Sequence, residues 1–254
     1  ILFDFPFEER HKLTHWSDVL GDIESFGTLE QRQHRLATAF EMGASFKDLW
    51  DKKAQNPGKH DLISIMLQSD AMKHMSHQEF MGNLILLIVG GNDTTRNSMT
   101  AFAYGLDKFP EERAKLEQNH DHDLAVNAMH ELIRWQTPLA HMRRTATEDV
   151  EMHGKTIRAG DKLLYWFASG NRDEAAFADP FRVDLFRKPN RHLSFGQGGP
   201  HVCLGMWLAR LEVKVLFQEL AMRLGSIEAT APHRFLRSNF VGGIKELPVR
   251  ITRA

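Results

Sequence analysis

Residues 195–205 read Phe195-Gly196-Gln197-Gly198-Gly199-Pro200-His201-Val202-Cys203-Leu204-Gly205 and contain the only cysteine of the 254-residue chain. The glycines and the proline ahead of Cys203 predict a loop. The apolar residues that follow at helical spacing predict an amphipathic helix; they are Leu204, Leu208, Leu211 and Val215. We therefore expect Cys203 where a glycine-rich loop runs into a helix N-terminus, whose unpaired N–H groups and dipole stabilise an anionic sulfur.

An anionic sulfur at a helix start suits a nucleophile or a metal ligand. The first alternative is a small buried hydrophobe, which is what an isolated cysteine most often is. The second is a zinc site, because Cys203 and some of the 14 histidines could act as ligands. However, the spacing of His201 and Cys203 is not a familiar zinc pattern, and the sequence has no second thiol.

The pattern Phe-Gly-x-Gly, with His two residues before Cys203 and Gly two residues after it, resembles the haem-binding signature of the cytochrome P450 family. In that family a Cys thiolate holds the haem iron. The resemblance implies heme b (iron protoporphyrin IX) as cofactor and Cys203 as the iron ligand. The further cofactor-binding residues that it implies are Gly91, Arg144, His192, Phe195, His201 and Gly205, of which Arg144, His192 and His201 would pair with the haem propionates. The sequence departs from the family at Gly199-Pro200, which make the loop one residue longer than the commonest spacing.

A long helix is predicted over residues 77–106, opened by a capping box between Ser76 and Glu79. Its middle reads Gly90-Gly91-Asn92-Asp93-Thr94-Thr95. These glycines and polar residues have low helix propensity and do not suit the interior of a buried helix. A surface kink, or threonines bonded back onto their own helix, would explain this composition. Beside the Cys203 loop, the stretch resembles the oxygen-activating part of the family's central helix. That resemblance implies a local distortion and two catalytic residues, with Asp93 relaying protons and Thr94 donating a hydrogen bond.

A Glu-x-x-Arg pattern, Glu131 and Arg134, lies on a helix predicted to begin at Asp123 and to end at Thr137-Pro138. As an ordinary exposed pair it would contribute only about 0.2–0.5 kcal/mol. It also resembles the structural pair of the family, whose third partner is an arginine ahead of the Cys loop. Arg182 is the best match for that partner, although Val183 stands where the family usually has an aromatic residue.

The β portion is predicted from short alternating segments. Residues 150–157 and 162–166 are expected to form hairpin strands around Gly154 and Gly160. The resemblance implies that residues 139–146 form an extended strand beside the haem. Residues 236–251 are expected to form a hairpin whose tip could touch substrate. The resemblance implies an apolar substrate pocket lined by Leu86, Val89, Leu139, Ala140, Phe240 and Val241.

Composition excludes several classes of protein. A net charge of −1 gives no argument for nucleic acid. A single cysteine fits a reducing, cytoplasmic compartment, and no apolar run is long enough to span a membrane. The sequence opens at Ile1 without an initiator Met, and the resemblance covers only the C-terminal part of the family's domain. We therefore expect the N-terminal part to be missing.

The sequence thus predicts a mainly α fold with a small β portion, and the resemblance implies that residues 1–254 form the C-terminal portion of a single cytochrome P450 domain. The resemblance implies a bacterial haem-thiolate monooxygenase that inserts one oxygen atom from O2 into a C–H bond of a lipophilic substrate. The expected substrates are alkanes, fatty acids or sterol-like side chains, hydroxylated at a chain end, although the pocket would suit a terpene as well. No flavin, nicotinamide or iron–sulfur motif is present, so ferredoxin and ferredoxin reductase are the expected electron donors. The alternative is a non-enzymatic helical module, or an inactive fragment, with Cys203 merely buried.

Overall fold

The computed structural model describes residues 2–22, 27–56, 58, 60–118 and 122–253. The chain divides into two compact units, Ile1–Asp93 and Thr94–Ala254. Helices predominate in both units and the strands are short, so the predicted mainly α fold with a small β portion is confirmed.

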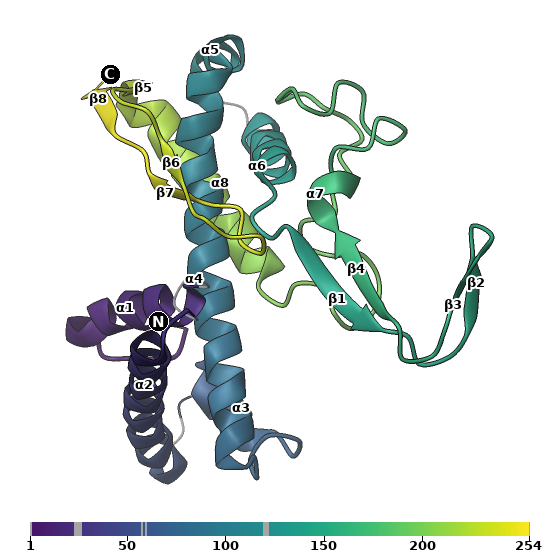
Figure 1. The fold of residues 1–254 in the computed structure, drawn as a ribbon. Coiled ribbons are helices and arrows are strands. Elements are labelled where there is room, and N and C mark those ends of the chain that lie inside the picture. Colours follow the sequence, from purple (N-terminus) through teal and green to yellow (C-terminus); the bar gives the residue numbers. More distant parts are fainter. Residues whose placement is uncertain (1, 23–26, 57, 59, 119–121, 254) are drawn as a thin grey trace. The chain divides into compact units, whose positions relative to one another are not determined.

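The first unit is helical and packs around aromatic residues. After a 3-10 turn, Phe7–Glu9, it contains α1 (Arg10–Gly21), α2 (Leu29–Gln55), α3 (Leu62–Gln68) and the first part of α4 (His77–Lys108), drawn in purple and blue in Figure 1. Trp16 on α1, Phe46 on α2 and Leu84 on α4 are fully buried. The ring of Phe5 lies 5.7 Å from that of Trp16 and 5.3 Å from that of Phe46. Burial of these large rings contributes strongly to the stability of this unit.

The start of α4 confirms the predicted capping box. The backbone N–H of Ser76 donates to Oε2 of Glu79 at 2.8 Å, and the backbone N–H of Glu79 donates to Oγ of Ser76 at 3.3 Å. The helix then runs for 32 residues, two residues beyond the predicted end. Despite this length, no helix in the described part of the chain is long and apolar enough to cross a membrane.

We expect Ser76→Ala to lower the free energy of unfolding by about 1 kcal/mol, because it removes one side of this reciprocal cap. Urea unfolding followed by circular dichroism would measure the change. Thr28→Ala is a matched variant, since Thr28 forms the same box with Gln31 at the start of α2. An unchanged midpoint for both variants would contradict the assigned caps.

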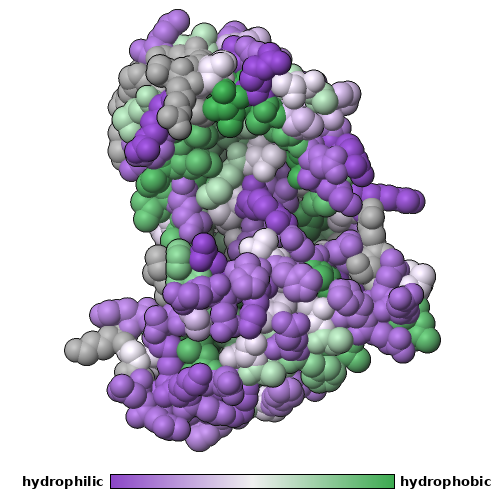
Figure 2. Space-filling model, turned by 90° about the vertical axis from the view of Figure 1, so that its left-hand side faces the viewer, coloured by the Kyte–Doolittle hydropathy of each residue, from purple (hydrophilic) through white to green (hydrophobic). Residues whose placement is uncertain are grey.

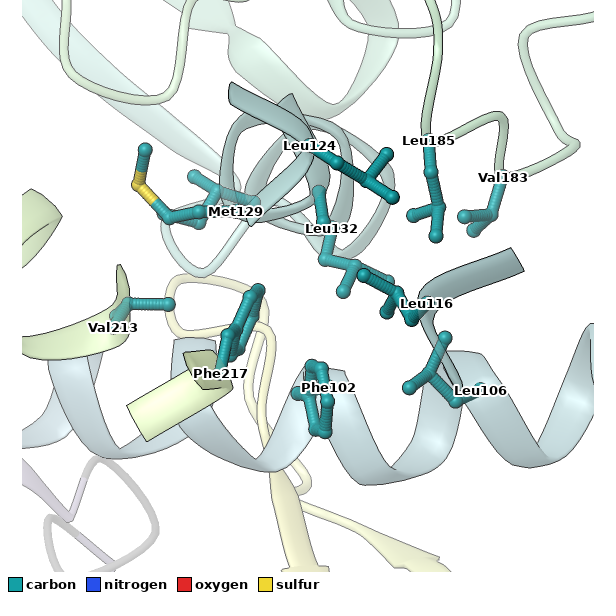
Figure 3. Packing of buried hydrophobic residues seen from close by; sticks show 12 residues of the cluster. Phe102, Leu106, Leu116, Leu124, Met129, Leu132, Val183, Leu185, Val213 and Phe217 are labelled. Atoms are coloured by element: carbon teal, nitrogen blue, oxygen red, sulfur yellow. The ribbon is translucent and has the colours of Figure 1, made fainter. Parts of the chain in front are cut away.

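The second unit packs four helices around one apolar cluster (Figure 3). The second part of α4 contributes Phe102 and Leu106, and the ring of Phe102 lies 4.1 Å from that of Phe217. The other helices are α5 (Pro110–Gln118), α6 (His122–Gln136) and α8 (Met206–Arg223), and a one-turn helix, α7, spans Phe167–Gly170. Val183 and Leu185, from the irregular segment before the Cys loop, are fully buried in the same cluster. The core therefore fixes α6, α8 and the approach to the Cys loop relative to one another.

The described strands form two-stranded antiparallel sheets. β1 (His141–Thr145) pairs with β4 (Lys162–Trp166), and β2 (Val150–Met152) pairs with β3 (Lys155–Ile157). β5 (Leu224–Ala229) pairs with β8 (Val249–Arg253), and β6 (Arg234–Phe235) pairs with β7 (Ile244–Glu246). The hairpin around Gly154 is as predicted. The hairpin assigned around Gly160 is wrong, because β4 returns to pair with β1 and leaves β2 and β3 paired with each other (Figure 1).

Candidate functional site

The Cys loop is a closed turn built on glycines in the left-handed region. Gly196, Gly198 and Gly199 have φ of 74°, 64° and 74°, which L side chains rarely adopt. The backbone N–H of Cys203 donates to the carbonyl of Phe195 at 2.9 Å and closes the loop. A Cβ added at Gly198 or Gly199 would meet no atom within 4 Å in the described part of the chain. These glycines therefore leave open space beside the loop, where backbone can approach a ligand closely.

Cys203 is a free and exposed thiol. The alternative in which it is merely buried is therefore wrong. The expected junction with the helix also needs correction, because α8 begins at Met206 and not at the cysteine. The backbone N–H of Met206 donates to the carbonyl of Cys203 at 3.3 Å, so a short turn separates the sulfur from the helix. The thiol therefore stands on a turn ahead of α8, where a ligand can reach it.

The apolar stripe predicted for α8 is real, but it does not face the core. Leu204 is 83% exposed, and Leu208, Leu211 and Val215 are exposed as well. The helix instead buries Val213 and Phe217. Figure 2 shows hydrophobic surface, drawn in green, between hydrophilic regions drawn in purple. Periodicity identified one apolar face of the helix, and packing against α4 and α6 selected another.

These residues fit a haem bound through Cys203. The donor is a single exposed thiol, the chemistry that a haem-thiolate site requires. Beside it, Leu204, Trp207 and Leu208 offer exposed apolar surface, and a Cβ at Gly205 would meet no atom within 4 Å among the described residues. A flat apolar ligand suits such a surface. The zinc alternative needs several protein ligands, and the described part of the chain brings together no group of three His, Cys, Asp or Glu side chains that could hold a metal ion.

The residues predicted to hold the haem propionates differ in burial and in their hydrogen-bond partners. Arg144 is half-buried on β1, where Nη1 donates to the carbonyl of Arg143 at 2.9 Å. His201 is exposed within the Cys loop. His192 is only 7% exposed, and Nε2 of its ring lies 2.9 Å from Nδ1 of His130 on α6. The backbone N–H of Ser194 donates to Nδ1 of His192 at 3.3 Å. Both ring nitrogens of His192 therefore already have partners.

An arginine that the sequence analysis did not single out lies behind the Cys loop. The guanidinium of Arg210 on α8 stacks 5.5 Å from the ring of Phe195 and 4.9 Å from that of Trp207. Its Nε is buried and has no hydrogen-bond partner within the described residues. Burial lowers the pKa of Arg210. This guanidinium links the start of α8 to the Phe195 end of the loop.

Burial, followed by the charge of Arg210, lowers the pKa of His130 to about 4. Burial, followed by the charges of His130, Arg210 and Arg134, lowers the pKa of His192 to about 3. Both pKa values lie below that of an unfolded histidine, about 6.5, so the unfolded chain binds more protons between about pH 6.5 and pH 4. Stability from these groups is present above about pH 6.5 and is lost as the pH falls through that window.

We expect the free energy of unfolding to fall by about 2 kcal/mol for each of the two histidines between pH 7 and pH 5. Urea titrations at a series of pH values would measure this slope. His192→Gln removes one of the two titrating groups and should flatten the profile. Equal slopes for wild type and His192→Gln would contradict the assignment.

The glycine-interrupted stretch of α4 stays helical throughout. Residues 90–95 are α-helical without a 3-10 or π segment, so the expected local distortion of the helix is not observed. Two glycines weaken a helix but do not remove its backbone donors as proline does, so the hydrogen-bond ladder can continue. Gly90 and Gly91 are exposed, and a Cβ at either would meet no atom within 4 Å in the described residues. Gly91 therefore leaves the helix backbone open on that side.

Asp93 is buried against α1. The hydroxyl of Ser17 donates to its Oδ1 at 3.3 Å, and a Cβ added at Gly21 would lie 2.3 Å from its Oδ2. The sequence analysis missed Ser17 and Gly21, because nothing in their local pattern points to a residue 70 or more positions away. Thr94 is half-buried, and its carbonyl accepts a hydrogen bond from the Ser98 hydroxyl at 2.8 Å.

The Glu131–Arg134 pair is bidentate and fully buried, with N–O distances of 2.8 and 2.7 Å. The prediction that Arg182 is the third partner is wrong. Arg187 occupies that place, with Nε 3.0 and 3.1 Å from the two carboxylate oxygens of Glu131. Arg182 is 55% exposed on its side chain and reaches Glu111 instead, at 3.4 Å. The turn around Asp184, whose N–H donates to Glu131 at 2.9 Å, directs the later arginine inward.

Four of the six residues predicted to face substrate come together in the second unit. Leu139 forms a β-bridge with Val241, and the N–H of Ala140 donates to the carbonyl of Phe240 at 2.8 Å. The ring of His141 packs edge-on against Phe240, at 5.7 Å. In the first unit, Leu86 is exposed on α4 and Val89 packs against the aromatic core.

Asn97, one turn after Thr94 on α4, lies under the C-terminal loop. A Cβ added at Gly243 would lie 2.5 Å from Oδ1 of Asn97, so a larger residue there would require the Asn97 side chain to move. The N–H of Gly242 donates to the carbonyl of Pro138 at 2.9 Å. These contacts bind the loop that carries Phe240 and Val241 to α4 and to the segment before β1.

Comparison with known proteins identifies relatives along almost the whole chain. The family described as cytochrome P450 matches residues 25–223. The chain is 37% identical over 249 residues to the methyl-branched lipid omega-hydroxylase of Mycobacterium tuberculosis, covering 98% of this chain and 58% of that protein. Among solved structures, cytochrome P450-153 from Novosphingobium aromaticivorans is 45% identical, with a TM-score of 0.89, and covers 99% of this chain and 60% of its own. CYP153D17 from Sphingomonas sp. PAMC 26605 is 51% identical, with a TM-score of 0.89, and the match covers 99% of this chain and 62% of that chain. The chain thus spans about three fifths of the length of these relatives.

Proposed function

Because the chain belongs to the cytochrome P450 family, we propose that it is the haem-bearing part of a monooxygenase that hydroxylates a lipophilic substrate. The exposed thiol of Cys203, on a glycine turn beside open apolar surface, carries the proposal. Cys203 is the proposed iron ligand, and Arg144, His192 and His201 are the proposed partners of the propionates. A guanidinium or an imidazole N–H suits a carboxylate in charge and geometry.

When bound, haem would supply the activation of O2 and the insertion of one oxygen atom into a C–H bond. The chain would supply the thiolate of Cys203 that holds the iron, and the protons. Asp93 is the proposed proton carrier, and the Ser17 hydroxyl that donates to its Oδ1 is placed to pass it a proton. The Thr94 hydroxyl is the proposed hydrogen-bond donor to the bound oxygen. Gly91, which leaves open space along α4, is the proposed point of close approach.

The proposed substrate is an alkane, a fatty acid or a sterol-like side chain, hydroxylated at a chain end. Leu139, Ala140, Phe240 and Val241 supply adjoining apolar side chains, which suit an alkyl chain. A relative that is 37% identical is an omega-hydroxylase of methyl-branched lipids, and this favours the chain end as the site of reaction.

The proposed electron donors are a ferredoxin and its reductase. From Leu185 to Leu211 the sequence holds four basic residues, Arg187, Lys188, Arg191 and Arg210, and no Asp or Glu. Lys188 and Arg191 are exposed. Such a charge balance around the Cys loop favours an acidic protein partner. The single cysteine supports a reducing, cytoplasmic compartment for this chain.

The test is the absorption spectrum of the haem-treated chain after reduction and addition of carbon monoxide. A Soret band at the thiolate position supports the proposal, and a spectrum without it in the presence of excess haem contradicts it. Substrate class is tested separately, by adding n-alkanes, fatty acids and a monoterpene to the haem-loaded protein and following the ferric Soret band. A shift with the monoterpene alone would overturn the proposed chain-end substrate and leave the haem site standing.

A further inference from the structure

Two imidazoles meet directly behind the segment that leads into the Cys loop. His130 lies on α6, one residue before Glu131, and His192 lies three residues before Phe195. Nδ1 of His130 is 2.9 Å from Nε2 of His192, and the ring centroids are 5.2 Å apart. The His192 ring also packs against Phe195, at 5.5 Å. The pair therefore joins α6 to the base of the loop.

The hydrogen-bond pattern assigns the tautomers. The backbone N–H of Ser194 donates to Nδ1 of His192, so this nitrogen carries the lone pair. A neutral imidazole has one N–H, and that of His192 must therefore be at Nε2. It donates to Nδ1 of His130, which in turn carries its own proton on Nε2. His192 thus has a single N–H, and His130 accepts it.

The charged groups around the pair are positive. After burial, which is the largest cause, the charges of Arg210 and Arg134 lower the pKa of His192, and the charge of Arg210 lowers the pKa of His130. The carboxylate of Glu131, the neighbour of His130 in sequence, is paired with the guanidiniums of Arg134 and Arg187. Nε of Arg210 has no acceptor within the described residues. The N–H groups of Arg210 and His192 therefore have no anionic acceptor within the described residues, and a haem propionate could supply one.

We propose that His130 is a positioning residue, which accepts the only N–H of His192 while haem is absent and releases it to a haem propionate. The inference rests on the proposed haem site. One N–H cannot donate fully to two acceptors, so haem binding has to open the histidine pair. A variant without the acceptor loses this hydrogen bond only in the haem-free protein and should bind haem more tightly.

Haem titration of the purified chain and two variants tests this. His130→Phe keeps a ring of similar volume but has no acceptor atom. We expect this variant to bind haem about tenfold more tightly than wild type, because about tenfold in an equilibrium constant is what one unsatisfied hydrogen bond costs. His130→Asn retains an acceptor oxygen and should remain within about twofold of wild type. Equal or weaker binding by His130→Phe overturns the inference. If that variant does not fold, His130→Leu takes its place with the same expectation.

The 15N spectrum of the haem-free chain gives a readout that needs no haem. We expect a protonated Nε2 and an unprotonated Nδ1 for His192, with loss of the single tautomer in His130→Phe and its return in His130→Asn. A proton on Nδ1 of His192 overturns this inference alone. Failure of wild type and variants to bind haem at all overturns both the haem site and the inference.

Discussion

The variant Glu131→Gln is expected to unfold with a free energy about 3–5 kcal/mol lower than wild type, the range for removing one partner of a buried ion pair. Its carboxylate accepts from Arg134 and Arg187, from the N–H of Asp184 and from the side-chain amide of Asn190. Glutamine offers one acceptor oxygen and places an NH2 group against these donors. Two guanidiniums would remain buried without a counter-charge, which is the costly part. Urea unfolding of the purified variant would measure the loss.

Two arginine variants separate the observed triad from the one expected from the sequence. Arg187→Ala removes a buried partner of Glu131 and should destabilise by about 3 kcal/mol. Arg182→Ala removes an exposed side chain that faces Glu111 and should cost at most about 1 kcal/mol. The reverse order of effects would restore Arg182 as the third partner and overturn the assignment to Arg187.

Cys203→Ala is expected to abolish the thiolate-type absorption of the reduced, carbon monoxide-treated protein, because the chain has no second thiol to take its place. The stability of the haem-free chain should change by no more than about 0.5 kcal/mol, since this side chain is exposed. Cys203→Ser is the matched variant, with an oxygen in place of sulfur. A thiolate-type band in either variant would remove Cys203 from the proposed site.

Local signals predicted local structure well. The capping box at Ser76 and Glu79 needs only residues three apart, and both of its hydrogen bonds are present. Glu131 and Arg134 likewise lie one helical turn apart, and their ion pair is bidentate. Its complete burial was not predictable, since an exposed pair has the same spacing.

Signals that depend on distant contacts were harder to interpret. Arg182 and Arg187 both precede the Cys loop, and which of them turns inward depends on tertiary contacts: the burial of Val183 and Leu185 and the hydrogen bond from the N–H of Asp184 to Glu131. The stripe from Leu204 to Val215 showed that α8 has an apolar face, but not that Val213 and Phe217 form the buried one. The partner of His192 also lies 62 residues earlier in the sequence, on a helix that was assigned only a structural role.

The hairpin of β2 and β3 is a suitable place to insert a tag or a label. These strands pair only with each other among the described sheets, and they turn at His153 and Gly154, both of which are exposed and have positive φ. Exposed loop tips are the sites that best tolerate added sequence. A short affinity peptide or a fluorescent label inserted between His153 and Gly154 would thus report on this protein without touching the thiol turn, the histidine pair or the carboxylate–guanidinium cluster.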